Sequence, residues 1–170
     1  MPAPTTGFAL FATALGHCGI AWGPRGLTGV QLPEADAATT RLRMQARFAR
    51  TPELPPPPEV QMAVAAISAL LAGQPTEPRD LGHLVLDMEG VPPFHQRVYA
   101  LARQIPPGET VTYGELARQL GEPGAARAVG QALGANPFAP VVPCHRILAA
   151  HSGSGGFSVS YTHLRAHETR

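Results

Sequence analysis

Two proline-rich stretches divide this 170-residue chain and limit the length of its regular elements. Residues 55–58 are four consecutive prolines, which predict an extended linker because the proline ring fixes φ and removes the N–H donor. Residues 90–93 (Gly-Val-Pro-Pro) give a second linker signal. We therefore predict two lobes: residues 1–90 as a support lobe and residues 91–158 as a lobe that carries the chemistry. The length allows two small lobes that share an interface.

Composition excludes several classes of protein. Hydrophobic residues make up 44% of the chain, enough for a core, so wholesale disorder is excluded. The sequence has no apolar run of 18 residues, so we expect no membrane span. The N-terminus lacks a basic segment ahead of its apolar stretch and is interpreted as a first strand rather than a secretory signal. The two cysteines, Cys18 and Cys144, are too few for a disulfide framework, which favours a cytoplasmic location.

The net charge is only +1, and all 13 basic residues are arginine. A general polyanion binder usually carries a larger positive excess, so we expect any contact with nucleic acid to be local. Four of the arginines lie in a predicted helix over residues 36–50, where such charges more often mark a solvated face than a binding strip. They are Arg41, Arg43, Arg47 and Arg50.

The first lobe has the pattern of a small sheet with helices. Residues 19–22 and 27–32 predict two strands, joined by a Gly-Pro-Arg-Gly turn at 23–26 that favours a hairpin. A second helix is predicted over residues 60–71 and a short strand over 84–86. The fold class predicted for the whole chain is α/β (α+β).

The second lobe contains three predicted helices. The first covers residues 94–104, with Phe94, Val98, Leu101 and Ile105 along one side. Thr112 is followed three positions later by Glu115, a capping-box pattern that starts a second helix, ending near residue 120. A glycine turn at 121–124 leads to a third helix, from about residue 125 to 134. The last two predict a helix-turn-helix, a pattern that many helical hairpins share.

The third predicted helix is built almost entirely from alanine and glycine. Such small residues permit close packing in a core, and they equally permit the backbone to approach a nucleic-acid groove. Arg127 is the one long side chain near its start, and it fits either a DNA contact or an ordinary solvated position.

The apolar segment 141–148 encloses a Cys-His-Arg triplet and is predicted to be β-like and buried. A buried cysteine is usually a small hydrophobe, but His145 and Arg146 beside Cys144 can lower a thiol pKa and supply a nucleophilic thiolate. Neighbours on a strand point to opposite faces, so Cys144 and His145 need a kink or a bridging water to communicate. A zinc site is not supported, because His17 and Cys18 do not complete a ligand set.

Five stretches of this sequence resemble the O6-alkylguanine-DNA alkyltransferase family. Residues 143–147 (Pro-Cys-His-Arg-Ile) resemble its active-site signature, and residues 105–117 resemble the segment that leads into its helix-turn-helix. Residues 126–130 and 136–137 resemble its recognition helix and following turn, and residues 155–158 its substrate loop. The resemblance is continuous over most of the second lobe, whereas the first lobe matches only loosely.

The resemblance implies direct repair of DNA in a winged-helix-like lobe. Cys144 would accept the methyl or other alkyl group of O6-methylguanine, giving S-methylcysteine and an inactivated protein after one turnover. His145 would take the thiol proton through a water, and Tyr113 would help to turn the nucleotide out and donate a hydrogen bond to the leaving purine. Asn136 would order the turn before the active-site segment. No cofactor and no metal is implied.

The resemblance also implies how DNA is bound. A monomer would place the helix-turn-helix in the minor groove of double-stranded DNA, largely independent of sequence and with no membrane involved. Arg127 would enter the base stack in place of the extruded nucleotide, beside Ala126 and Gly130 on the same helix. The pocket for the flipped base would be lined by Phe94, Leu133, Ile147 and Ser158.

The sequence departs from the family pattern after Ser158. Residues 159–170 lack the apolar helical stripe and the glutamate that would orient the histidine, so we interpret them as a non-native tail. Two alternatives therefore stay open, above all for a truncated chain. One is a protein that binds alkylated bases without transferring the group. The other is a winged-helix DNA-binding regulator in which Cys144 is only structural.

Overall fold

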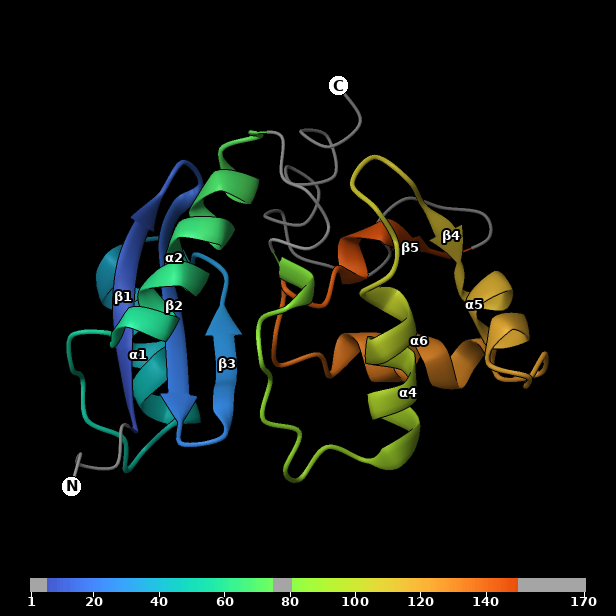
Figure 1. Ribbon diagram of the computed structural model, residues 1–170, viewed down its shortest axis with the longest axis horizontal. Coiled ribbons are helices and arrows are strands. Elements are labelled where there is room, and N and C mark those ends of the chain that lie inside the picture. Colours follow the sequence, from blue (N-terminus) through green and yellow to red (C-terminus); the bar gives the residue numbers. More distant parts are fainter. Residues whose placement is uncertain (1–5, 75–80, 150–170) are drawn as a thin grey trace. The chain divides into compact units, whose positions relative to one another are not determined.

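The computed structural model describes residues 6–74 and 81–149 (Figure 1). Contacts between residues divide the chain into two compact units. The first comprises Met1–Asp87 together with the short segment Pro137–Ala139, and the second comprises Met88–Asn136 and Pro140–Arg170. Three residues from late in the sequence therefore pack with the first unit.

The first unit contains a three-stranded antiparallel sheet in the order β1-β2-β3. Its strands are β1 (Gly7–Thr13), β2 (Gly16–Gly23) and β3 (Gly26–Gln31). The predicted hairpin is confirmed, with Gly23 paired to Gly26 across the turn. Gly26 has a φ of 129°, and a Cβ there would lie 2.6 Å from the Val85 carbonyl oxygen, so this corner requires glycine.

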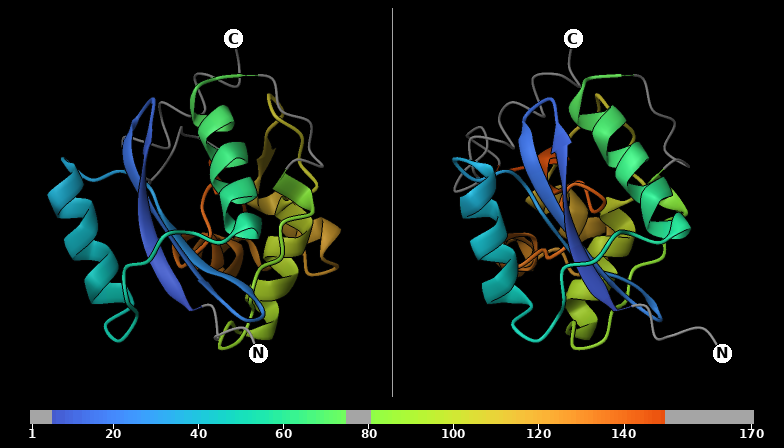
Figure 2. Two further views of the ribbon diagram at one scale, coloured as in Figure 1. Left: turned by 60° about the vertical axis from the view of Figure 1, so that its left-hand side comes forward. Right: turned by 90° about the vertical axis from the view of Figure 1, so that its left-hand side faces the viewer.

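Helices α1 (Ala37–Arg47) and α2 (Pro58–Leu71) cover opposite faces of this sheet (Figure 2). The Asp36 carboxylate caps α1 by accepting hydrogen bonds from the backbone N–H and the hydroxyl of Thr39, at 2.8 and 2.6 Å. These bonds lower the pKa of Asp36. Both predicted helices are confirmed, but Pro58 is helical rather than extended. Proline suits the first helical position, where no N–H donor is needed.

Alternate residues of β2 enter two apolar layers. On the side of α1, Ala21 packs with Phe8 and Met44, and Leu10 and Phe48 pack against this cluster. The pleat directs Cys18, Ile20 and Trp22 to the opposite side, toward α2. The strand is therefore the centre of the first unit's core.

The strand predicted over residues 84–86 is wrong in extent. Only Leu86 forms a bridge, to Leu27 of β3. Two hydrogen bonds hold it there: the Leu27 N–H donates to the Val85 carbonyl at 2.9 Å, and the Asp87 N–H donates to the Leu27 carbonyl at 2.8 Å. A single bridge adds an edge contact but no further strand.

The second unit contains α4 (Pro93–Ala102), α5 (Tyr113–Gln119) and α6 (Ala126–Gly134), with the short strands β4 (Val111–Thr112) and β5 (Ile147–Leu148). The three predicted helices are confirmed. The buried face of α4 differs from the predicted one, because Tyr99 and Ala102 are buried together with Val98 whereas Leu101 is only half-buried.

The helix-turn-helix is formed by α5 and α6, as predicted. The Thr112 hydroxyl accepts a hydrogen bond from the Glu115 N–H at 3.1 Å and caps α5. Arg97 of α4 holds the turn, since its guanidinium donates to the Leu120 carbonyl at 2.7 Å and to the Glu122 carboxylate at 3.0 Å. The turn is thus fixed from a third helix.

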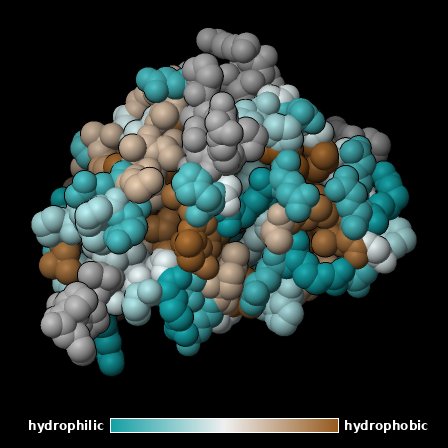
Figure 3. Space-filling view, in the orientation of Figure 1, coloured by the Kyte–Doolittle hydropathy of each residue, from teal (hydrophilic) through white to brown (hydrophobic). Residues whose placement is uncertain are grey.

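Hydrophilic and hydrophobic residues are interspersed on the visible face of the molecule (Figure 3). No helix in the described part of the chain is both long and apolar enough to cross a membrane. Among the described residues of the first unit, four large apolar side chains are exposed: Leu42, Leu54, Met62 and Val85.

Candidate active site

The Cys-His-Arg triplet forms a single turn of 3-10 helix, Cys144–Arg146, and not the predicted β-like run. Pro143 has φ −82° and ψ 66°, the geometry of the central residue of an inverse γ-turn. The Cys144 N–H accordingly donates to the Val142 carbonyl at 2.8 Å, and the Arg146 N–H donates to the Pro143 carbonyl at 2.9 Å. The chain thus reverses at Pro143 and presents Cys144 at the start of a turn, which is the kink that the sequence required.

The turn is buried and anchored by its own arginine. Cys144 and His145 are fully buried, and Arg146 is 5% exposed. The Arg146 guanidinium donates a buried hydrogen bond of 2.7 Å to the Ile105 carbonyl, in the loop that follows α4. Successive side chains of a 3-10 turn point about 120° apart, so Cys144 and His145 diverge less than neighbours on a strand. A bridging group can therefore link them.

Asn136, just beyond the end of α6, supports the same turn. Its side-chain amide donates to the Val142 carbonyl at 2.9 Å. That carbonyl also accepts the Cys144 N–H, so one oxygen joins the end of α6 to the reversal of the chain at Pro143. The contact is local in space and spans six residues of sequence.

Tyr113 lies at the first position of α5, directly after β4. β4 pairs in parallel with β5, placing Val111 beside Ile147, so the segments that carry Tyr113 and Cys144 belong to one small sheet region. A Cβ on Gly130 of α6 would lie 3.1 Å from the Tyr113 ring. Close packing of α5 against α6 is therefore one reason for the small residue at this position.

The remaining predicted site residues lie on the helices of the second unit or on β5. Arg127 is exposed in the first turn of α6, and Ala126 beside it is half-buried. Leu133 and Ile147 are buried, and Phe94 is half-buried on α4. Ser158, the substrate loop and residues 159–170 lie outside the described residues.

Sequence reasoning missed Tyr99. Its hydroxyl donates to the Ala132 carbonyl of α6 at 2.6 Å, and its side chain is fully buried. Burial, with a smaller contribution from the charge of Cys144, raises the pKa of Tyr99 to about 12. Tyr99 therefore stays protonated near the cysteine. The sequence signal that could have indicated Tyr99 is a tyrosine next to Val98 on a helix whose other buried residues are apolar.

A groove of about 510 Å³ in the first unit is not part of this site. It is lined by apolar residues such as Trp22, Val60 and Val85, with Arg25, Glu59 and His83 also on its wall. Within residues 6–74 and 81–149, no group of three or more His, Cys, Asp or Glu side chains could hold a metal ion.

Comparison with known proteins assigns the family. The protein-family model described as "6-O-methylguanine DNA methyltransferase, DNA binding domain" matches residues 93–168. A methylated-DNA–protein-cysteine methyltransferase of Mycobacterium bovis is 42% identical over 130 residues, which are 75% of this chain and 76% of that protein. The crystal structure of Mycobacterium tuberculosis OGT in complex with DNA is similar with a TM-score of 0.75 and 34% identity, covering 95% of this chain and 92% of that chain.

The mixed α/β fold is shared more widely than the sequence. The O6-methylguanine-DNA methyltransferase of the hyperthermophilic archaeon Pyrococcus kodakaraensis has a TM-score of 0.71 at 23% identity, covering 96% of this chain and 99% of that one. Together with the Mycobacterium matches, the helix-turn-helix and the Cys-His-Arg turn agree with the resemblance found in the sequence. This chain belongs to the methylated-DNA–protein-cysteine methyltransferase family.

Proposed function

We propose that this protein repairs DNA by direct reversal, transferring the alkyl group of O6-methylguanine to the sulfur of Cys144. The observation that carries the proposal is the position of Cys144 at the start of a buried turn. Asn136 holds that turn from one side and Arg146 from the other. A helix-turn-helix lies in the same unit, and DNA is the partner that family membership supports.

The transfer is a displacement at the alkyl carbon. The Cys144 thiolate attacks the methyl carbon, so an S–C bond forms while the C–O6 bond breaks and its electron pair stays on O6. His145 accepts the thiol proton through a bridging water, and guanine takes up one proton as its N1–H and O6 carbonyl are restored. The net movement is one methyl group to sulfur and one proton to the base. The thioether product is stable, so each molecule acts once.

Three residues support this step by position. Tyr113, on the first turn of α5, donates a hydrogen bond to the leaving purine and helps to turn the nucleotide out. Arg127, exposed on α6, fills the gap in the base stack. Asn136 keeps the turn before Cys144 in place. In this proposal a monomer binds the minor groove without strong preference for sequence, in the cytoplasm and without a cofactor.

Intact-mass spectrometry tests the central claim. After incubation with a duplex that contains O6-methylguanine, we expect the intact protein to gain the mass of one methyl group. After digestion, the gain should lie on the peptide that contains Cys144. The same duplex without the lesion should give no gain. If a folded sample binds the modified duplex but gains no mass, the protein is a reader of alkylated bases and the transfer proposal is wrong.

Arg127→Ala tests the proposed role in turning out the nucleotide. We expect slower transfer from duplex DNA and nearly unchanged transfer from the free base O6-methylguanine, because a free base needs no extrusion. Arg118→Ala is the matched control, since Arg118 is also exposed but lies in the last turn of α5. Equal losses on the two substrates would contradict insertion of Arg127 into the base stack.

A further inference from the structure

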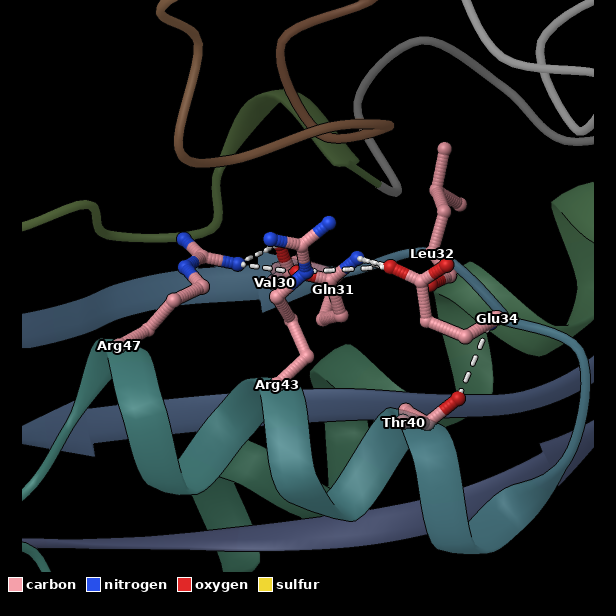
Figure 4. Close-up of polar contacts among 7 residues, drawn as sticks. All are labelled: Val30, Gln31, Leu32, Glu34, Thr40, Arg43 and Arg47. Carbon is pink, nitrogen blue, oxygen red and sulfur yellow. Dashed lines mark hydrogen bonds and ion pairs between the residues drawn. The ribbon is translucent and has the colours of Figure 1, made fainter.

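Arg47, in the last turn of α1, differs from the other arginines of this helix. Its Nη1 donates to the Val30 carbonyl at 2.9 Å and to Gln31 Oε1 at 3.0 Å, and its Nη2 donates to the Pro137 carbonyl at 3.2 Å. Figure 4 shows the side chain extending from α1 to the end of β3. The prediction of a solvated face is therefore wrong at Arg47, whereas Arg41 and Arg43 are exposed and pair with glutamates.

The Arg47 guanidinium is held by the Pro137 carbonyl, the Phe48 ring and the space left by Gly29. We call this arrangement the Arg47 seat. The Pro137 carbonyl accepts a second hydrogen bond, from the Val30 N–H at 2.8 Å. The Arg47 guanidinium also lies 5.1 Å from the centre of the Phe48 ring. A Cβ on Gly29 would come within 2.6 Å of Phe48 Cζ and 2.8 Å of Arg47 Nη2. Glycine at position 29 thus leaves the space that the guanidinium occupies.

The Arg47 seat is adjacent in the sequence to a residue that supports the active-site turn. Pro137 directly follows Asn136, whose amide holds the Val142 carbonyl at the reversal before Cys144. The segment from Pro137 to Pro143 therefore starts at a carbonyl fixed by Arg47 and ends at the catalytic turn. On the basis of the proposed alkyl transfer, we infer that Arg47 is a positioning residue, which acts on Cys144 through Pro137 and touches neither DNA nor base.

Loss of this contact should affect the chemical step more than DNA binding. Without Arg47, the Pro137 carbonyl keeps the bond from Val30, but the segment that follows gains freedom. A displacement of about 1 Å at a reacting group can cost up to about 100-fold in rate, so a partial release predicts a loss of about tenfold. Arg47 belongs to the first unit and not to the helix-turn-helix, so the affinity for DNA should stay within about twofold.

The test is single-turnover kinetics of Arg47→Met in the full chain, with the duplex concentration varied. We expect the rate at saturating duplex to fall about tenfold, with partial rescue in Arg47→Lys, which can reach one oxygen. Arg43→Met is the matched control, because it removes an arginine from the same helix that pairs with Glu34 and not with Pro137. Gly29→Ala keeps Arg47 but crowds its seat, and should also slow transfer.

Alkylation of the two thiols by iodoacetamide, read by peptide mass, is measured on the same samples. A positioning role predicts that Arg47→Met raises the rate at Cys144 several-fold and leaves Cys18 unchanged, whereas general destabilisation raises both rates together. The inference is overturned if folded Arg47→Met transfers at the parent rate, if Arg43→Met is slowed equally, or if both thiols change in parallel. If the parent protein transfers no methyl group, the proposed function fails, and the thiol ratio still decides the role of Arg47.

Discussion

Cys18 and Cys144 are both fully buried, but their surroundings differ in kind. Cys18 lies within β2, paired with Phe11 of β1, and its sulfur is 3.9 Å from the Thr13 hydroxyl. Burial raises the pKa of Cys18 to about 12, and the contact with Thr13 offsets this only in part. The thiol is therefore a small apolar group of the core.

Cys144 instead follows a reversal of the chain and begins a helical turn. It is followed in the sequence by His145 and Arg146, and its backbone N–H donates to the same carbonyl as the Asn136 amide. Burial alone therefore does not distinguish a structural thiol from a reactive one. The distinguishing features are an irregular backbone held by polar side chains and ionisable neighbours within the turn.

The largest expected effect separates the two thiols by replacing each in turn. Cys144→Ser should abolish methyl transfer while the protein still binds DNA, because a hydroxyl is a far weaker nucleophile at neutral pH. Cys18→Ser should keep transfer, with some loss of stability from a buried hydroxyl. Intact-mass spectrometry and a DNA-binding titration on both variants check this. Residual transfer in Cys144→Ser, or its loss in folded Cys18→Ser, would reverse the assignment.

The pH dependence of stability should sharpen the comparison. The pKa of Cys18 rises from 9.0 to about 12 on folding, so the folded protein favours the protonated thiol. The resulting stabilisation is complete below about pH 9 and is lost as the pH rises toward 12. At about 1.4 kcal/mol per pKa unit, roughly 2 kcal/mol is lost by about pH 10.5 and about 4 kcal/mol at full ionisation.

Urea unfolding between about pH 8 and pH 10.5 measures this loss. Tyr99, whose pKa is raised from 10.0 to about 12, titrates in part of the same window. Cys18→Ala serves as the control for that contribution, since it removes the thiol and leaves the tyrosine. Its free energy of unfolding should fall less steeply with pH than that of the parent. Parallel curves would show that Cys18 is not the group responsible.

The sequence predicted elements whose signals are local. The Gly-Pro-Arg-Gly turn predicts the β2–β3 hairpin, and the Thr112 capping box predicts the start of α5, because each signal lies within four residues. The same reliance on local signals makes the prediction for the active-site segment wrong at the Cys-His-Arg triplet, which forms a 3-10 turn, although its burial and its strand at Ile147–Leu148 agree with the prediction. Its valines, isoleucine and leucine favour a strand, and the reversal at Pro143 depends on an amide outside the segment, from Asn136.

The role of Arg47 could not have been predicted from its surroundings in the sequence. Four arginines in one helix indicate a solvated face, and the carbonyl that distinguishes Arg47 belongs to Pro137, 90 residues further along the chain. The seat for the guanidinium also depends on Gly29, on a different element. The roles assigned to Tyr113, Arg127 and Ser158 stay predictions, since they concern contacts with DNA or a loop outside the described residues.

The smallest expected effect tests whether polar anchoring, rather than packing, holds the turn of Cys144. Arg146→Met keeps the length of the side chain but removes the buried hydrogen bond to the Ile105 carbonyl. A hydrogen bond from a charged group is worth about 1.5–3 kcal/mol, so urea unfolding should show a loss of that size. Iodoacetamide should then modify Cys144 faster, while Cys18, held by its strand, should keep its rate.

Arg118→Met, at an exposed position on α5, is the control and should change neither the free energy of unfolding nor the rate of thiol modification. If both thiols react faster in Arg146→Met, the arginine stabilises the whole fold, and the two cysteines differ less in their anchoring than their geometry indicates.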